Sequence, residues 1–565
     1  MNLQLPQRSK PGKTSFNSST DAIRNWIDQL PLLNTSRTAE LVTGALEQIN
    51  TLNIPVTQRF AALDLFTTPV MCTTDSMKKS FIGKPVPLHG PDLELVRQTI
   101  ELYNLMATGY RILADDLGSD NGQQQLLATA IHRALRYLSE ILLTNYQIYV
   151  QYPDGLWSIM HALYTLAEKF GLVTQAITDT TLHTPEASSI DSIYKQILLL
   201  SLACPYRLRQ TEIPYVYNEL FGWAEASRLF NPAAADARGL FAVDLSRDAP
   251  PAYRALLSEQ QDQRQLRLLD TSVMQQKMLQ ATALESGAAG RMGGLGSSGT
   301  MQRLMPAWGA MPKRRFSRKR EHGQTSRLDL VVGLNAIHQM SAAPTPVEQH
   351  NNDISETISS HQYLQDPTFE APTSIRTDFG IAHGKRSAPG AEHDRDNPLK
   401  GAYLANHTAA ARHETWTMRD ISAGGYCLLH EAEDASSVRI GELVAVPPGA
   451  SSHPESLQVG VVRWLRFTRE HGLELGLQLL SPGARAVSVS ICEDEINRPE
   501  RLQGVLLPEI KALRQPATLL LPSLPFRTGC RSMIQDGDTN AAIILTRQLE
   551  NTGCFAHYDF SRTDQ

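Results

Sequence analysis

Five residues of this chain have the types and spacing of a binding site for phosphate groups or nucleobases. Asp420, Ser422 and Gly425 fit the pattern (Asp/Asn)-x-Ser-x-x-Gly within the stretch Asp-Ile-Ser-Ala-Gly-Gly. Earlier in the chain, Arg314 and Arg318 form Arg-x-x-x-Arg inside a basic run. The planar fork of arginine binds a phosphate, or the O6/N7 edge of guanine, with two hydrogen bonds. Lysine, a point charge, offers neither the fork nor a stacking face.

The two motifs, in this order and followed by β-rich sequence, resemble the ligand signature of PilZ domains, the bacterial receptors for cyclic di-GMP. Residues 439–446, 458–465 and 475–480 are also similar to PilZ strands. The resemblance covers 312–340 and 413–495, so the domain would be split. It implies an antiparallel β-barrel that binds cyclic di-GMP, and control of a surface behaviour such as pili, flagella or exopolysaccharide.

For a ligand with two phosphates and two guanines, each residue of the motifs has an expected role. The two arginines, four positions apart, can each bind a different part of one compact ligand. Asp420 supplies an acceptor for guanine N–H donors, and Ser422 supplies a small hydroxyl. Gly425 permits a close approach or a positive φ that a side chain would forbid. Arg315 and Arg320 can assist electrostatically, although simple exposure would explain them equally well.

Length and composition limit the classes of protein. A chain of 565 residues predicts about three domains. Its formal net charge of −5 means that any basic site must be local. No apolar run is long enough to insert into a membrane, and the N-terminus lacks a signal-peptide core. The six cysteines include no Cys-x-x-Cys pair, so we expect reduced thiols, a cytoplasmic location and no metal site.

The N-terminal half has the pattern of helices. Residues 1–20 are polar and predict a flexible tail, whereas 21–285 predict an all-α domain with a last helix over 253–285. The clearest helical spacing is that of Leu127, Ile131, Leu135, Leu138 and Leu142. No fixed repeat period is evident. The fold class is therefore multidomain, with an all-α N-terminal domain followed by an all-β, PilZ-like antiparallel barrel and extra C-terminal β structure.

Residues 286–311 have the composition of a Gly/Ser-rich linker. They include a Gly-x-Gly-x-x-Gly at Gly294, Gly296 and Gly299. A dinucleotide-binding loop of this pattern needs a strand before it and a helix after it. Neither is evident, so we interpret the segment as a plain linker.

The β-rich half is expected in four pieces. Residues 312–340 would form the first part of the barrel, including a strand over 327–338. The stretch 341–412 has few aliphatic residues and predicts a disordered insertion. Residues 413–495 would complete the barrel. A C-terminal β extension, 496–565, would pack on the barrel or form a second, smaller sheet.

The remaining residues point away from catalysis. There is no His-Glu-x-x-His, no Gly-x-Ser-x-Gly and no phosphate-binding P-loop. Trp416 and Trp464 are expected in the barrel core. We therefore predict a protein that is not an enzyme and has no cofactor, with cyclic di-GMP as its ligand.

Two other functions remain open alongside the receptor. In the receptor hypothesis, the helical domain contacts an unidentified protein partner and senses ligand occupancy. The alternative is a scaffold whose barrel is ligand-free and whose helical domain makes the protein contacts. Nucleic-acid binding by the basic run is disfavoured, because the lone Phe316 is a poor stacking platform.

Overall fold

The chain folds into two compact units, which are described separately. The computed structural model describes residues 3–12, 16–118, 122–178, 187–234, 237–257, 262–288, 297–310, 319–320, 327–342, 412–422, 424–430, 435–447, 457–492, 501–511 and 514–563. The first unit comprises Met1–Glu285 and Thr300–Met311, and the second comprises Ser286–Gly299 and Pro312–Gln565. The arginine motif and most of the expected insertion lie outside the described residues.

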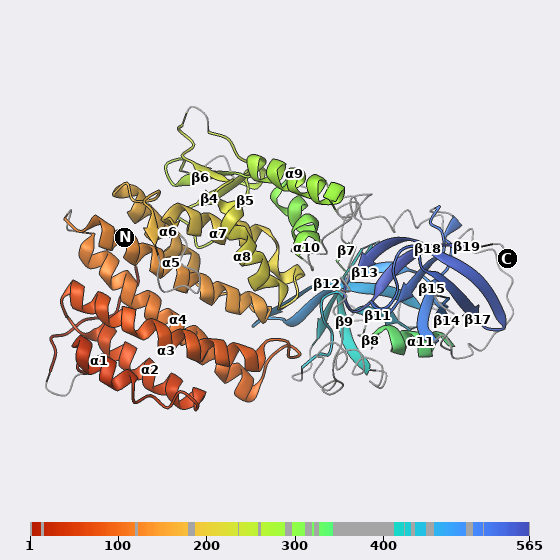
Figure 1. Ribbon diagram of the computed structural model, residues 1–565, viewed down its shortest axis with the longest axis horizontal. Helices are drawn as coiled ribbons and strands as arrows, with labels where there is room; N and C mark the ends of the chain where they lie inside the picture. The colour runs from red at the N-terminus through yellow and green to blue at the C-terminus, as the bar shows by residue number, and fades with distance from the viewer. Residues whose placement is uncertain are drawn as a thin grey trace, which may run out of the picture. The chain divides into compact units, whose positions relative to one another are not determined.

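The first unit is mainly helical, as the sequence predicts (Figure 1). Its helices are α1 (Thr20–Ile27), α2 (Thr35–Thr51), α3 (Val56–Phe81), α4 (Gly90–Leu117), α5 (Gln124–Gln147), α6 (Leu156–Lys169), α7 (Ile190–Leu202), α8 (Glu212–Ala224), α9 (Ser272–Ala288) and α10 (Ser297–Leu304). Short 3₁₀ turns η1 (Pro205–Arg207), η2 (Arg254–Leu256) and η3 (Met305–Trp308) join them. All five apolar positions that predicted α5 are buried, and so are most of the other residues of this helix, which lies in the core of the unit. None of the described helices is both long and apolar enough to cross a membrane.

The N-terminal segment is packed on this unit, so the prediction of a loose tail is wrong for residues 3–12. Leu3 is buried in the helical core. The Arg8 guanidinium donates to both carboxylate oxygens of Asp116 at 2.7 and 2.8 Å. The Ser9 amide donates to the Thr51 carbonyl at 2.8 Å. These partners lie far away in the sequence, which explains why local composition did not reveal them.

A small antiparallel sheet interrupts the helices. It has the order β3 (Arg228–Phe230), β6 (Leu266–Asp270), β4 (Phe241–Asp244) and β5 (Ala252–Tyr253). A separate ribbon pairs β1 (Ile177–Thr178) with β2 (Ala187–Ser188). The prediction of a helix over 253–285 is therefore wrong before Ser272, where α9 begins. The local spacing of this segment is helical, but pairing of β6 with β4 and β3 stabilises a strand instead.

The segment expected as a linker is partly folded. Gly299 lies in α10, and the element before the glycine run is the helix α9 rather than a strand, so a dinucleotide-binding unit is not formed there. Gly294 and Gly296 lie outside the described residues. Beyond α10, Trp308 is fully buried in the helical core, and its Nε1 donates to the Leu199 carbonyl at 2.9 Å. Residues 300–310 are therefore an anchored part of the first unit.

The second unit begins with a barrel of six antiparallel strands. Around the ring these are β8 (Arg327–Val332), β9 (Arg412–Ser422), β10 (Gly425–His430), β13 (Gly472–Ser481), β12 (Gln458–Thr468) and β11 (Leu443–Val446). Pairing of β10 with both β9 and β13 closes the ring. β7 (Lys319–Arg320) pairs with the last part of β9, on the same edge that β8 uses and opposite the edge that pairs with β10. The two pieces of the split barrel do meet, because β8 pairs along its whole length with β9.

One expected strand is shorter than predicted. The strand expected over 327–338 ends at Val332, and Gly333 follows with a φ of +99°. Helix α11 then runs from Leu334 to Ala342. Its apolar residues face the two barrels, where Leu334 and Ile337 are buried in a shared core. Helix α11 is too short, and follows the strand too directly, for its helical spacing to be recognised in the sequence.

The C-terminal extension forms a second, closed barrel. Its strands follow the order β14 (Arg485–Ile491), β15 (Leu502–Leu507), β16 (Thr518–Leu521), β19 (Ala556–Arg562), β18 (Thr539–Asn551) and β17 (Arg531–Asp536). β14 pairs with β15 and β17, so the strand expected at the end of the first barrel belongs to the second.

The two barrels share an apolar core. Val459 and Val461 of β12 lie in one cluster with Val505 of β15 and Phe555, which precedes β19. The Thr552 hydroxyl also donates to the Gly441 carbonyl at 2.7 Å. The second barrel is therefore packed on the first rather than tethered beside it.

Acid is expected to destabilise both units through buried histidines. Burial lowers the pKa of His161 in α6, and of His557 in β19, to about 4. The unfolded chain would bind these protons near pH 6.5, so stability present above that pH is lost as the pH falls toward 4. We expect each histidine to cost on the order of 2–3 kcal/mol between pH 7 and 4.5.

Urea unfolding at the two pH values measures this loss. His161→Gln should flatten the pH dependence for the helical unit, and His557→Gln should do so for the barrel unit. An unchanged pH dependence in either variant would show that other groups take up the protons.

Candidate functional site

The site is built on the hairpin between β9 and β10. β9 ends at Ser422 and β10 begins at Gly425, and the two residues are direct partners across the strands. The Ser422 hydroxyl donates to the Gly425 carbonyl at 3.2 Å. Two positions along the hairpin, Asp420 is the partner of Cys427. The structure thus brings together the three residues of the Asp-x-Ser-x-x-Gly pattern, because a tight hairpin places them on neighbouring strands.

Gly425 has a physical reason to be glycine. Its φ is +156°, a value that residues with a side chain rarely adopt. A Cβ at this position would overlap the backbone carbonyl of Leu477 on β13. The bare backbone therefore allows β10 to approach β13 closely at the start of the strand.

Asp420 lies in a row of residues that crosses four strands. Cys427 is paired with Asp420 on one side and with Gly476 on the other, and Gly476 is paired with Trp464. Cross-strand partners share one face of a sheet. The alternate residues on β10 and β13, Tyr426, Leu428, Leu475 and Leu477, are buried in the barrel interior. The row of Asp420 therefore belongs to the outer face of the barrel.

Trp464 does not lie in the barrel core, so the prediction for this residue is wrong. Trp416 is buried, as expected, but Trp464 is only half-buried and lies on this outer face. A Cβ on Gly476 would overlap the Trp464 indole, so the ring lies directly over the glycine. A β-bulge between Val462 and Trp464 shifts the register. Because a bulge changes which face the following residues occupy, simple alternation could not place this ring.

Of the arginine motif, the structure describes only the end of its segment. Arg314, Arg315 and Arg318 lie outside the described residues. The next two residues, Lys319 and Arg320, form β7, and β7 pairs with β9 so that Arg320 is opposite Asp420 and Lys319 is opposite Ile421. The backbone that follows Arg318 therefore reaches the Asp-x-Ser-x-x-Gly hairpin, despite the long stretch of sequence between them.

Ion pairs surround the hairpin on the same sheet. Glu474 of β13 is almost fully buried and pairs with Arg466, whose Nη2 lies 2.6 Å from Oε2. Arg419, which precedes Asp420, pairs with the other Glu474 oxygen. Two guanidinium groups thus share one carboxylate here, and with the Asp420 carboxylate the formal charges of this cluster sum to zero.

The described part of the chain offers no site for a metal ion. Within it, no three His, Cys, Asp or Glu side chains are grouped closely enough to hold one. The chemistry available at the hairpin is hydrogen bonding, charge and an aromatic face, all of which serve binding.

Three family models match consecutive parts of the chain. The N-terminal domain of the cyclic-di-GMP receptor FimW matches residues 21–234. The middle PilZ domain of that receptor matches residues 240–486, and its C-terminal β-barrel domain matches residues 487–563. The boundary at 487 agrees with the pairing of β14 in the second barrel. None of the three descriptions names a catalytic activity.

A curated relative extends the likeness over nearly the whole chain. The cyclic-di-GMP receptor FimW of Pseudomonas aeruginosa is 27% identical over 585 aligned positions, which cover 99% of this chain and 93% of the relative. No solved structure matches the chain. The domain order and the closed barrels agree with these matches. The chain therefore belongs to the family of PilZ-domain cyclic di-GMP receptors.

Proposed function

We propose that this protein binds cyclic di-GMP on the outer face of the first barrel, through Arg314, Arg318, Asp420, Ser422 and Gly425. The observation that carries the proposal is the pairing of β7 with β9. That pairing brings the backbone directly after Arg318 to the register of Asp420, so that both motifs can serve one ligand.

The chemistry of the hairpin fits a cyclic dinucleotide. The carboxylate of Asp420 can accept hydrogen bonds from the N1–H and N2–H donors of guanine. The Ser422 hydroxyl suits a phosphate oxygen, and the two arginines suit phosphate or the O6/N7 edge of guanine. The half-buried ring of Trp464 offers a surface for base stacking on the same face. Arg315 and Arg320 would add positive charge.

Coupling to the helical unit follows from how the arginine segment is anchored at each end. On its N-terminal side, Trp308 is buried in the helical core, and the Tyr253 hydroxyl donates to the Gly309 carbonyl at 3.2 Å. On its C-terminal side, Lys319 is held in the barrel by β7. A ligand held by Arg314 and Arg318 would bind the stretch of chain between these two anchors and so restrain both units. The helical unit would then present a changed surface to a protein partner.

The wider role rests on the family. We propose a non-catalytic receptor, located in the cytoplasm and without a cofactor, that controls a bacterial surface behaviour such as pili, flagella or exopolysaccharide. Its partner would be a protein bound by the helical unit, with neither nucleic acid nor membrane insertion involved.

Titration calorimetry with cyclic di-GMP tests the proposal. Arg314→Ala/Arg318→Ala should weaken binding about 100-fold or more, because each lost charge-assisted contact costs about 1.5–3 kcal/mol. Asp420→Ala alone should weaken it by about tenfold or more, since guanine donors would lose their acceptor.

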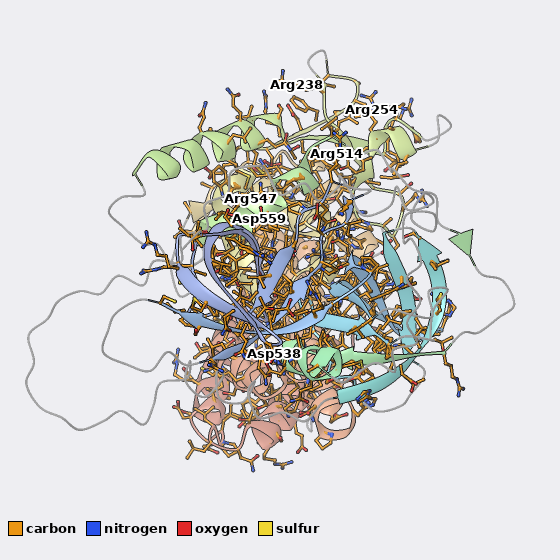
Figure 2. The ribbon with its side chains drawn as sticks, turned by 90° about the vertical axis from the view of Figure 1, so that its right-hand side faces the viewer. Arg238, Arg254, Arg514, Asp538, Arg547 and Asp559 are labelled. Carbon is orange, nitrogen blue, oxygen red and sulfur yellow. The ribbon has the colours of Figure 1, made fainter. Side chains whose placement is uncertain are left out.

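A matched control removes the same charge elsewhere. Arg254 of the helical unit and Arg514, which precedes β16 in the second barrel, are exposed arginines outside the two motifs, and both are labelled in Figure 2. Arg254→Ala/Arg514→Ala should bind like the wild-type protein. Equal heats from the wild type and the Arg314→Ala/Arg318→Ala variant would reject the proposed site and favour the ligand-free scaffold.

A further inference from the structure

The outer face that carries the site continues to the second barrel. One cross-strand row runs from Ser422 through Gly425 and Gln478 to Val461. Val461 lies in the apolar core shared with the second barrel. Ser422 and Gln478 are two strand spacings apart, about 10 Å. The second barrel therefore borders the proposed ligand site. Gly425, which has no side chain, lies between Ser422 and Gln478, the residue next to that border.

Arg463 occupies this border. It is the extra residue of the bulge in β12. Its Nε donates to Oε1 of Gln478 at 2.6 Å. Its Nη1 and Nη2 donate to the two carboxylate oxygens of Glu550 on β18, the second contact at 3.0 Å. The side chain is 19% exposed, so the ion pair is largely shielded from water.

These contacts fix the orientation of a cation. A guanidinium held by a bidentate carboxylate on one edge and by an amide oxygen at Nε has little rotational freedom. The Arg463 guanidinium is hydrogen-bonded to Gln478, which is the cross-strand partner of Gly425. Without Arg463, the second barrel would present the Glu550 carboxylate to this border. Arg463 neutralises that charge and keeps the edge compatible with an anionic ligand.

We propose that Arg463 is a further ligand-binding residue that contacts a phosphate of the cyclic dinucleotide, with Glu550 as its positioning residue. The second barrel would then complete the site as well as support the first barrel. This inference rests on the proposed function, because it places the ligand on the same outer face. It extends the site to a domain that neither sequence motif includes.

Calorimetry on the full chain, combined with a double-mutant cycle, tests the inference. Arg463→Gln should weaken cyclic di-GMP binding by about tenfold or more. Glu550→Gln, which keeps the shape but loses the charge that orients Arg463, should weaken it about threefold to fivefold. The double variant should bind no more weakly than Arg463→Gln, because Glu550 acts through Arg463.

Further measurements separate this role from a purely structural one. The affinity of Arg463→Gln should depend less steeply on salt than that of the wild type, since one cation–phosphate contact is missing. Arg463→Lys, which retains the charge and is less disruptive to folding, should bind with an intermediate affinity. The matched control is Arg547→Gln, which removes the Arg547–Asp559 ion pair of β18 and β19 (2.8 Å; Figure 2) and should bind within twofold of the wild type.

The outcomes are distinguishable. Wild-type affinity in both Arg463→Gln and Arg463→Lys would overturn the inference while leaving the proposed function intact. Losses that multiply in the double variant would overturn the positioning role of Glu550. A wild-type protein that gives no heat with cyclic di-GMP would reject the proposed function and this inference together.

Discussion

Replacing Gly425 by alanine is expected to destabilise the barrel unit by about 3–5 kcal/mol and to abolish cyclic di-GMP binding. The methyl group would overlap the Leu477 carbonyl, which is held in the ladder between β10 and β13. The strands would have to separate where β10 begins, and a positive φ would be strained in addition. Because Ser422 is paired with Gly425, the same movement would displace part of the proposed ligand site. Urea unfolding and calorimetry measure the two effects.

A control substitution at a glycine in the second barrel measures the cost of the positive φ without the steric overlap. Gly537 has a φ of +59°, and a Cβ there would meet no atom within 4 Å. Gly537→Ala should therefore cost only about 1 kcal/mol and leave ligand binding unchanged. A cost for Gly425→Ala as small as that for Gly537→Ala would mean that the close approach of β10 and β13 is not required.

Replacing Trp308 by alanine is expected to destabilise the helical unit by about 3–5 kcal/mol. The side chain is fully buried, and its Nε1 hydrogen bond to the Leu199 carbonyl would be lost. The Trp308 carbonyl also accepts from the Thr271 hydroxyl at 2.6 Å, so the end of α10 and the start of α9 would loosen together. Cyclic di-GMP affinity should change less than threefold, since the proposed ligand residues lie in or border the other unit. Chemical unfolding of each unit, followed separately, gives the first readout.

Hydrogen exchange gives the second readout, which concerns coupling. In the wild-type protein, cyclic di-GMP should slow amide exchange in residues 300–310, and Trp308→Ala should remove that effect. Arg303→Gln is the control, because it removes only the partly exposed ion pair with Glu212 (2.7 Å) and should cost less than about 1 kcal/mol. An exchange response that persists in Trp308→Ala would show that the signal reaches the helical unit by another route.

The local half of the candidate site could be predicted because it lies within one hairpin. Asp420, Ser422 and Gly425 are so close in sequence that a tight turn brings them together whatever the rest of the chain does. The helices with clear periodicity, such as α5, were predictable for a similar reason. The spacing of their buried positions follows from the geometry of a single helix.

The other half of the site depends on residues that are distant in sequence. Nothing local shows that Arg320 is opposite Asp420, that Trp464 covers Gly476, or that Arg463 pairs with Glu550. A bulge moved Trp464 onto the outer face, and bulges leave no reliable mark in a sequence pattern. These residues could be found only once the strands had been paired.

Local sequence was enough to reveal the motifs and to predict the helical first half and the β-rich second half, because side-chain periodicity and turn chemistry act over a few residues. Only the folded chain shows that β14 joins the second barrel, that β6 is a strand, and that residues 300–310 are anchored to the helical unit. In each case the free energy comes from burying apolar surface and pairing strands with partners far along the chain. The sequence of a short segment does not specify which distant segment it will pair with.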